Sequence, residues 1–200
     1  TASIIAAENG HQGIVELLLT KCNNVDATDN SGRTALITAV RNQKLEQVKD
    51  LLKDTTINVN LQDEDGRTAL IWACINRRLD IVVTILGDKN LKDEIDVDLT
   101  DKDGNNAFTL AMKHGHLDIA LAILGDKNLK DEIDVNAQDG FGRTLFMNAC
   151  YKGHLDVVRF LLAKNLDFGV DHNDLSLAFV YAIENGHSNV VKYLLSTPKS

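Results

Sequence analysis

Histidine is the residue type of this chain best suited to catalysis or metal binding, but the spacing of its six copies supports neither role. His114 and His116 are the two closest in sequence, yet residues two apart do not share one face of a helix. The sequence contains no Ser-His-Asp ordering, no phosphate-binding P-loop and no H-E-x-x-H zinc motif. We therefore expect no catalytic residue, no cofactor and no metal site.

Two acidic strings, DEDG (63–66) and DKDG (101–104), resemble calcium-binding loops. An EF-hand loop also needs an acidic residue two positions before the first Asp and a Glu six positions after the Gly. Those positions hold Leu61 and Trp72 in the first string, and Leu99 and Leu110 in the second. The strings instead favour turns, in which the Asp side chain accepts backbone N–H groups and the Gly tolerates positive φ.

Composition indicates a folded protein without a strongly basic surface. The 200 residues are 44% hydrophobic and 25% charged, and the net charge is −8. That balance argues against a nucleic acid or an anionic membrane as the main partner. No apolar run approaches the roughly 20 residues that span a bilayer. Three scattered cysteines favour an intracellular, cytoplasmic setting. Abundant Asn with a single Pro suggests an AT-rich genome; in an intracellular bacterium the setting would be the host cytoplasm.

A duplicated string shows how the chain is organised. ILGDKNLKDEIDV begins at Ile85 and again at Ile123, and the same frame fits the rest of the sequence. Every unit reads as a turn, a short helix, a tight corner, a second helix and a loop. A small residue at one fixed point is what close approach of neighbouring helices requires. One alanine column fixes the register: Ala6, Ala39, Ala73, Ala111, Ala149 and Ala182.

The units resemble the ankyrin repeat, whose consensus carries G-x-T-P-L-H-x-A-A, then G-H-L, an acidic residue, an aliphatic residue and Val, and then a leucine pair. DGFGRTLFMNACYKGHLDVVRFLL from Asp139 shows most of these landmarks. The resemblance implies an all-α solenoid of stacked helix-turn-helix units with hairpin-like fingers, forming one domain over residues 1–200. It implies a structural role for the corner histidines His11, His116, His154 and His187. The expected units are approximately 1–28, 29–62, 63–100, 101–138, 139–173 and 174–200.

The sequence departs from the family pattern at two kinds of position. Ala-Leu-Ile replaces Pro-Leu-His in the second and third units, so we expect apolar packing to join neighbouring units there. Gln43 and Arg77 replace the corner glycine, which costs roughly 1 kcal/mol in a left-handed conformation. Cys74 and Cys150 fall in one column two units apart, too far for a disulfide, and are expected to be buried.

The duplicated string lengthens two units. Leu91 and Ile95 are four residues apart, as are Leu129 and Ile133, which predicts one apolar face of a short helical turn. The added segment is either an extended helix or loop that stacks on its neighbours, or a separate recognition lobe. The first unit lacks its finger, which suggests a segment of a longer protein. The last finger is shortened between Asp171 and Leu175.

Family members usually grip partners with the finger tips and the outward side of each first helix. Carried over by position, this set includes an apolar strip of Trp72, Ile75, Leu110 and Tyr151. Trp72 and Leu110 are alternatively fillers between units. Aromatic and arginine residues dominate interface hot spots. The expected partner-binding residues are Arg33, Arg41, Glu64, Asp65, Arg67, Trp72, Ile75, Lys102, Asp103, Leu110, Lys113, Phe141, Arg143, Asn148, Tyr151 and Tyr181.

Three functions agree with this sequence. The leading one is a non-enzymatic module that binds another protein through its concave face and finger tips, monomeric as an isolated segment. The second is a substrate-recruiting or autoinhibitory segment of a larger multidomain enzyme or effector. The third is a structural, self-associating solenoid. In the first case, replacing Trp72 or Tyr151 by Ala should cost at least about 2 kcal/mol of binding with little change in Tm.

Overall fold

A computed structural model describes residues 1–21, 24–88, 91, 95–125, 141–163 and 172–196. These residues form helices joined by turns and loops, with no strand among them. The helices are α1 (Ala2–Glu8), α2 (Gln12–Lys21), α3 (Ala35–Arg41), α4 (Leu45–Leu51), α5 (Ala69–Ile75), α6 (Leu79–Leu86), α7 (Ala107–Lys113), α8 (Leu117–Gly125), α9 (Leu145–Lys152), α10 (Leu155–Ala163), α11 (His172–Glu184) and α12 (Ser188–Ser196).

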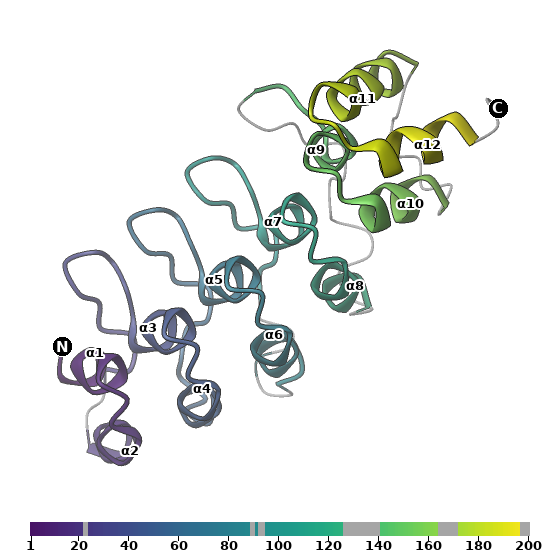
Figure 1. Ribbon diagram of the computed structural model, residues 1–200. Coiled ribbons are helices and arrows are strands. Elements are labelled where there is room, and N and C mark those ends of the chain that lie inside the picture. Colours follow the sequence, from purple (N-terminus) through teal and green to yellow (C-terminus); the bar gives the residue numbers. More distant parts are fainter. Residues whose placement is uncertain (22–23, 89–90, 92–94, 126–140, 164–171, 197–200) are drawn as a thin grey trace.

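Consecutive helices form pairs, and the pairs stack side by side along the molecule. The first helix of each pair lies in one row and the second helix in another, and loops project beyond the first row as fingers (Figure 1). Contacts between α1 and α3, α3 and α5, α5 and α7, α7 and α9, and α9 and α11 make the first row continuous. The all-α solenoid predicted from the sequence is confirmed.

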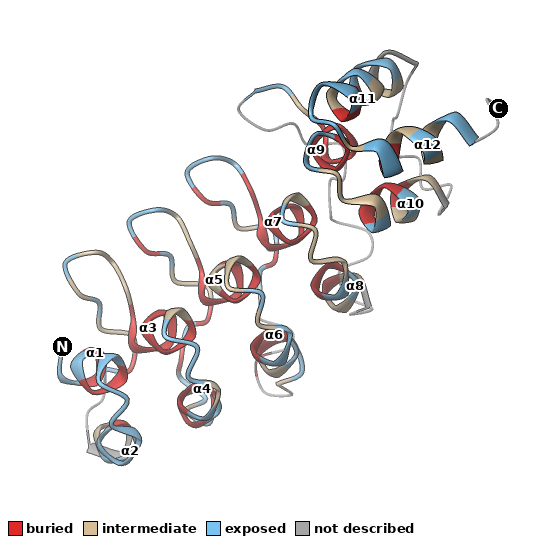
Figure 2. Ribbon diagram, in the orientation of Figure 1, coloured by how far each residue is buried: buried red, intermediate tan, exposed pale blue. Residues whose placement is uncertain are grey.

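The alanine column lies at the centre of the stack. All six alanines are at most 3% exposed. The buried residues, coloured red, lie along the first row and where it meets the second (Figure 2). A methyl group at each of these points lets neighbouring helices pack closely. The prediction of an alanine seam through the stack is therefore confirmed.

Polar side chains start most of the first helices. Thr34, Thr68 and Thr144 each accept a hydrogen bond from the backbone N–H three residues on, at 3.2–3.3 Å, which is the geometry of a helix N-cap. Asn106 does the same for α7, accepting from Thr109 N at 2.9 Å. The Asn106 side-chain oxygen can accept this backbone hydrogen bond as a threonine hydroxyl does, so asparagine also serves as an N-cap.

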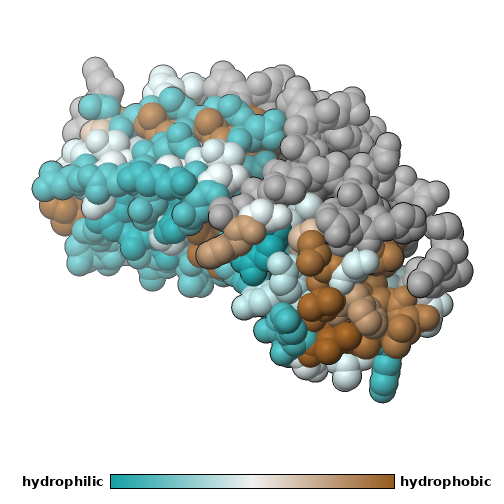
Figure 3. Space-filling model, turned by 90° about the horizontal axis from the view of Figure 1, so that it is seen from above, coloured by the Kyte–Doolittle hydropathy of each residue, from teal (hydrophilic) through white to brown (hydrophobic). Residues whose placement is uncertain are grey.

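The last pair differs from its prediction. Helix α11 begins at His172 and has thirteen residues, so a unit boundary at 173/174 would cut through a helix. The described part of the shortened finger from Asp171 to Leu175 is accordingly helical from His172. On α11, Val180 and Ile183 are 46% and 53% exposed, although the matching residues of the inner helices are buried. Seen from the finger side, apolar side chains gather at the C-terminal end of the molecule (Figure 3).

Two corners carry the expected backbone strain. Gln43 and Arg77 have φ of 57° and 53°, in the left-handed region that favours glycine. The corresponding residue of α9 is Gly153, with φ of 75°. The two helix pairs α3/α4 and α5/α6 therefore contain a conformation that costs an L-residue roughly 1 kcal/mol and costs glycine little.

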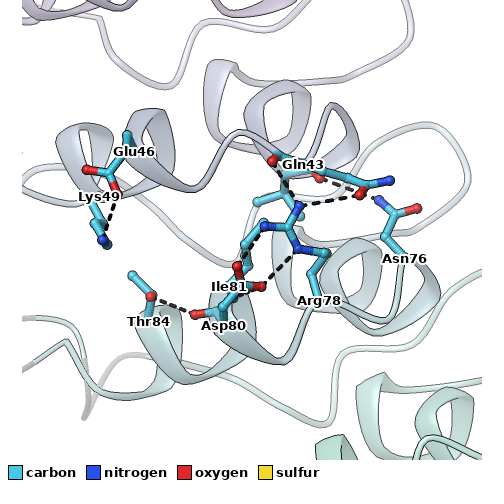
Figure 4. Close-up of polar contacts among 9 residues, drawn as sticks. Gln43, Glu46, Lys49, Asn76, Arg78, Asp80, Ile81 and Thr84 are labelled. Atoms are coloured by element: carbon cyan, nitrogen blue, oxygen red, sulfur yellow. Dashed lines mark hydrogen bonds and ion pairs between the residues drawn. The ribbon is translucent and has the colours of Figure 1, made fainter.

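Apolar packing alone does not join the pairs, which corrects the expectation from the missing Pro-Leu-His. Arg78 donates from Nη1 to the Gln43 carbonyl oxygen at 2.9 Å and binds Asp80 at 2.6 Å (Figure 4). Asn76 Nδ2 reaches the Arg41 carbonyl oxygen at 3.4 Å. Residues at the corner and at the end of the first helix thus supply polar contacts between neighbouring pairs.

The first duplicated segment packs against the stack where it is described. Leu91 is buried at 1% exposure and Ile95 is half-buried against the core. Helix α6 ends at Leu86, and neither Leu91 nor Ile95 is helical. The helical turn predicted there is therefore absent at these two residues, and their burial favours a loop that stacks on its neighbours. Leu129 and Ile133 of the second copy lie outside the described residues, as do Cys22 and the boundary at 138/139.

Two cysteines lie in the interior of the stack. Cys74 and Cys150 are free and buried, as predicted, and burial raises the pKa of each thiol to about 12. Within the described ranges, no helix has the length and apolar character to cross a membrane.

Candidate partner-binding surface

The three fingers before α3, α5 and α7 share one construction. In the middle finger, Asp63 Oδ1 accepts hydrogen bonds from Asp65 N at 3.0 Å and Arg67 N at 2.9 Å. Asp29 and Asp101 make the corresponding bonds in the other two. The turn predicted for the Asp-x-x-Gly strings is thus closed by the Asp side chain.

Neighbouring fingers are hydrogen-bonded to each other. Glu64 N donates to the Ser31 carbonyl oxygen, and Lys102 N donates to the Asp65 carbonyl oxygen, each at 2.9 Å. Gly66, with φ of 76°, lies so close to the next finger that a Cβ would come within 3.1 Å of Lys102 N. The fingers therefore form a connected row. We call this row, with the outward side chains of α3, α5, α7 and α9, the finger face.

Trp72 lies in a closed cluster on the finger face. Its indole is contacted by the guanidinium groups of Arg41 and Arg67, which lie 4.9 and 4.8 Å from the ring centroid. Its Nε1 donates to Asp63 Oδ2 at 2.8 Å, and the half-buried ring packs against the core. Because Arg41 comes from the preceding helix pair, the cluster joins two pairs. We call Arg41, Asp63, Arg67 and Trp72 the closed cluster.

A second aromatic group lies further along the finger face and is open to solvent. Arg143 stacks on Phe141 and on Tyr151, with its guanidinium 4.8 Å from each ring centroid. Phe141 is 83% exposed and Tyr151 is 37% exposed. Tyr181 of α11 meets Tyr151 edge to face at 6.0 Å. We call Phe141, Arg143, Tyr151 and Tyr181 the open cluster.

Two predicted contact residues are not available to a partner. Leu110 is 5% exposed and Asn148 is 4% exposed. Both directly precede an alanine of the seam, and Thr38 at the matching position of α3 is 2% exposed. Leu110 therefore fills the space between pairs, whereas Trp72 and Tyr181 at the same position are half-buried. Burial removes Leu110 and Asn148 from the predicted contact set, and the continuous apolar strip is not formed.

The position two residues after the seam alanine points outward. Tyr151 is exposed there, while Arg41, Ile75 and Lys113 are half-buried. Two predicted finger-tip arginines are held within their own loops: Arg33 pairs with Asp29 at 2.7 Å and Arg67 with Asp65 at 3.4 Å. The remaining predicted tip residues are exposed: Glu64, Asp65, Lys102 and Asp103.

Sequence reasoning did not identify Asp63 as the partner of Trp72. Nine residues separate them, and only the fold of the finger back onto α5 brings the carboxylate to the indole. It also did not identify what His187 contacts. The His187 Nε2 lies 2.9 Å from the Tyr151 carbonyl oxygen, which joins the last two pairs through the corner.

The same kind of corner contact joins α7 to α9. His154 bonds to the Lys113 backbone, and its ring covers Gly115 so closely that a Cβ there would lie 2.6 Å from the His154 Nδ1. Burial lowers the pKa of His154, and the charges of Lys152 and His114 lower it further. The imidazole is therefore held neutral at pH 7, in a structural role.

Comparison with known proteins agrees with this architecture. The family model for ankyrin repeats (3 copies) matches residues 1–63, 48–139 and 127–200. The crystal structure of EF0377, an ankyrin repeat protein, is similar to this chain with a TM-score of 0.81 and 26% sequence identity, and the similarity covers 98% of both chains. No curated protein matches the sequence. Because the family matches span the whole sequence, the chain belongs to the ankyrin repeat family, whose members are generally protein–protein interaction modules and typically non-catalytic.

Proposed function

We propose that this chain binds a partner protein through its finger face, with the open cluster as the main anchor. The observation that carries the proposal is the exposure of Phe141 and Tyr151 on either side of one arginine. Aromatic rings and arginine dominate binding hot spots, because they desolvate a large, rigid area and keep a polar handle. Binding of this kind requires no cofactor.

The fingers support the same role. Side-chain hydrogen bonds close each described finger, and backbone bonds link it to the next. A partner that docks there meets a pre-ordered surface, so little conformational entropy is lost on binding. The exposed tip residues Glu64, Asp65, Lys102 and Asp103 would then contribute polar contacts around the aromatic anchor.

The closed cluster has a different part in this proposal. Trp72 already contacts Arg41, Arg67 and Asp63. A partner would gain little by touching a ring whose faces are covered. We assign Trp72 to the joint between helix pairs and keep Arg41 and Arg67 only as edge contacts.

Affinity capture from a cell extract tests the proposal. The bait variants are a Phe141→Ala/Tyr151→Ala double variant and a matched Val83→Ala/Leu121→Ala control, whose side chains are exposed on the second-row helices α6 and α8. We expect proteins retained by the native chain to be retained by the control and lost from the double variant. Equal retention by all three baits would contradict the proposal. Circular dichroism of each bait confirms that it is folded.

A further inference from the structure

Positive charge gathers beside the open cluster, although the chain as a whole carries −8. Lys113 at the end of α7 and Lys152 at the end of α9 come from neighbouring helix pairs. Burial lowers the pKa of Lys152, and the charges of Lys113 and Arg143 lower it further. Lys152 directly follows Tyr151, on whose ring Arg143 stacks, and α7, which carries Lys113, packs against α9. Adjacent elements thus bring these three cations to one part of the surface.

Among the described residues, Lys113 and Lys152 form no ion pair, unlike several other cations. Arg33 pairs with Asp29 at 2.7 Å, and Arg78 pairs with Asp80 at 2.6 Å. In the described part of the chain, no carboxylate lies within 4.0 Å of Lys113 or Lys152. The Lys113 Nζ donates only a long bond of 3.4 Å to Asn105 Oδ1. Their charge remains available to a ligand.

The corner histidines His116 and His154 add little to this positive charge, because their lowered pKa values favour the neutral imidazole at pH 7. His114 is exposed, and its ring stacks on His116 at 5.9 Å. Burial lowers the pKa of His116, and the charges of Arg77 and His114 lower it further. On the other side, Glu184 occupies in α11 the position that Lys113 and Tyr151 occupy in α7 and α9, so the cationic region ends there.

Resting on the function proposed above, we propose that the partner presents an extended acidic segment to this surface. An aromatic or aliphatic side chain of that segment packs on Phe141 and Tyr151, and flanking Asp or Glu residues pair with Lys113 and Lys152. The pairing has two physical reasons. Opposite charge steers and orients association. An apolar side chain desolvates the exposed rings, which the stacked Arg143 holds in place.

Selection from a displayed library of random dodecapeptides tests this inference on the whole chain. We expect the enriched peptides to carry net negative charge and at least one aromatic or large aliphatic residue. Affinity for the Lys113→Glu/Lys152→Glu variant should fall on the order of tenfold, because two attractive pairs become repulsive. Raising the salt concentration should also weaken native binding. A Lys49→Glu/Lys192→Glu variant, with the same charge change at exposed positions of α4 and α12, is the control.

The outcomes separate this inference from the proposed function. Enriched peptides that are neutral or basic, yet lose affinity for the Phe141→Ala/Tyr151→Ala variant, would overturn the acidic partner and leave the binding surface standing. Acidic peptides that bind the Lys113→Glu/Lys152→Glu variant with the same affinity as the native chain would also overturn the acidic partner. Peptides insensitive to every finger-face variant would contradict the proposed function itself. Tighter binding of a twelve-nucleotide uridine RNA than of the acidic peptides would reassign the surface to nucleic acid.

Discussion

Around Trp72 and around Tyr151, the chain combines arginine with aromatic rings in two different ways. At Trp72, two guanidinium groups and a carboxylate enclose one indole, and the cluster ties α3 to α5. At Tyr151, one guanidinium lies between two rings that remain exposed. The difference lies in how far the surrounding side chains cover each aromatic ring.

In both halves, a corner residue contacts the backbone of the preceding helix pair. Arg78 donates to the Gln43 carbonyl oxygen, and His187 Nε2 lies 2.9 Å from the Tyr151 carbonyl oxygen. The corners differ in the residue at positive φ, which is Gln43 or Arg77 in two early pairs and Gly115 or Gly153 in two later ones. The His154 and His187 rings lie directly against Gly115 and Gly153, so a glycine corner leaves room for a histidine ring on the backbone.

The largest expected effect comes from filling a glycine corner. In Gly153→Ala, the new Cβ would fall on the His187 ring, whereas no described atom lies within 4 Å of a Cβ at Gly186. Both glycines have φ near 75°, so both substitutions cost roughly 1 kcal/mol of backbone strain. Overpacking should add about 1–3 kcal/mol for Gly153→Ala alone. Urea unfolding measures the free energy of unfolding of both variants. An equal loss of stability in Gly153→Ala and Gly186→Ala would show that the His187 ring at the corner does not help to join the pairs.

The next prediction compares the two aromatic clusters directly. Trp72→Ala should lower the free energy of unfolding by about 2–3 kcal/mol, because a packed and hydrogen-bonded ring is lost. Tyr151→Ala should lower it by less than about 1 kcal/mol, since its side chain is exposed. This revises the sequence-based expectation that Tm barely moves in both. Denaturation followed by far-UV circular dichroism checks it; a smaller loss for Trp72→Ala than for Tyr151→Ala would refute the assignment.

Relieving strain in the N-terminal corners should raise stability. Gln43→Gly and Arg77→Gly should each gain about 1 kcal/mol, because glycine adopts their positive φ without the steric cost. Asn42→Gly is the matched control, since Asn42 has φ of −83° and gains nothing from the change. The midpoint of thermal unfolding reports the result. A loss of stability in both corner variants would show that the two side chains contribute more than the strain they carry.

The smallest effect is a dependence of stability on pH. The pKa values of His116 and His154 are lowered in the folded state, chiefly by burial, so the unfolded chain binds more protons near pH 6. Their contribution to stability is complete above the ordinary histidine pKa and is lost as the pH falls below it. We expect Tm to fall between pH 7.5 and 5.5, and to fall less in His154→Gln. An equal slope in the variant would exclude His154 as a cause.

The sequence predicted the fold well, because repetition makes its signals redundant. The alanine column, the threonine caps and the two non-glycine corners could all be placed by aligning the units. The division into six units remains an interpretation, and the approximate boundary at 173/174 falls inside α11, whose finger lacks the usual turn string.

The binding surface was harder to predict, because it depends on side chains that meet across units. Trp72 and Tyr151 both belong to the outward side of a first helix by resemblance. They differ in their offset from the seam alanine, but the offset alone does not decide burial: Asn148 and Leu110 are buried at the position where Trp72 and Tyr181 are half-buried. The contact of Asp63 with Trp72 had no sequence signal. Lys113 and Tyr151, by contrast, share the outward position and remain proposals for partner contact.

The most direct test is the dissociation constant of the tightest library-selected peptide, measured by calorimetry for two variants. Trp72→Phe retains an aromatic ring in the closed cluster. Phe141→Ala/Tyr151→Ala removes two of the three aromatic rings of the open cluster. We expect affinity within about twofold of native for Trp72→Phe, and a loss of about 30-fold or more for the double variant, as for a hot spot of 2 kcal/mol. A large loss in Trp72→Phe with native affinity in the double variant would contradict the account.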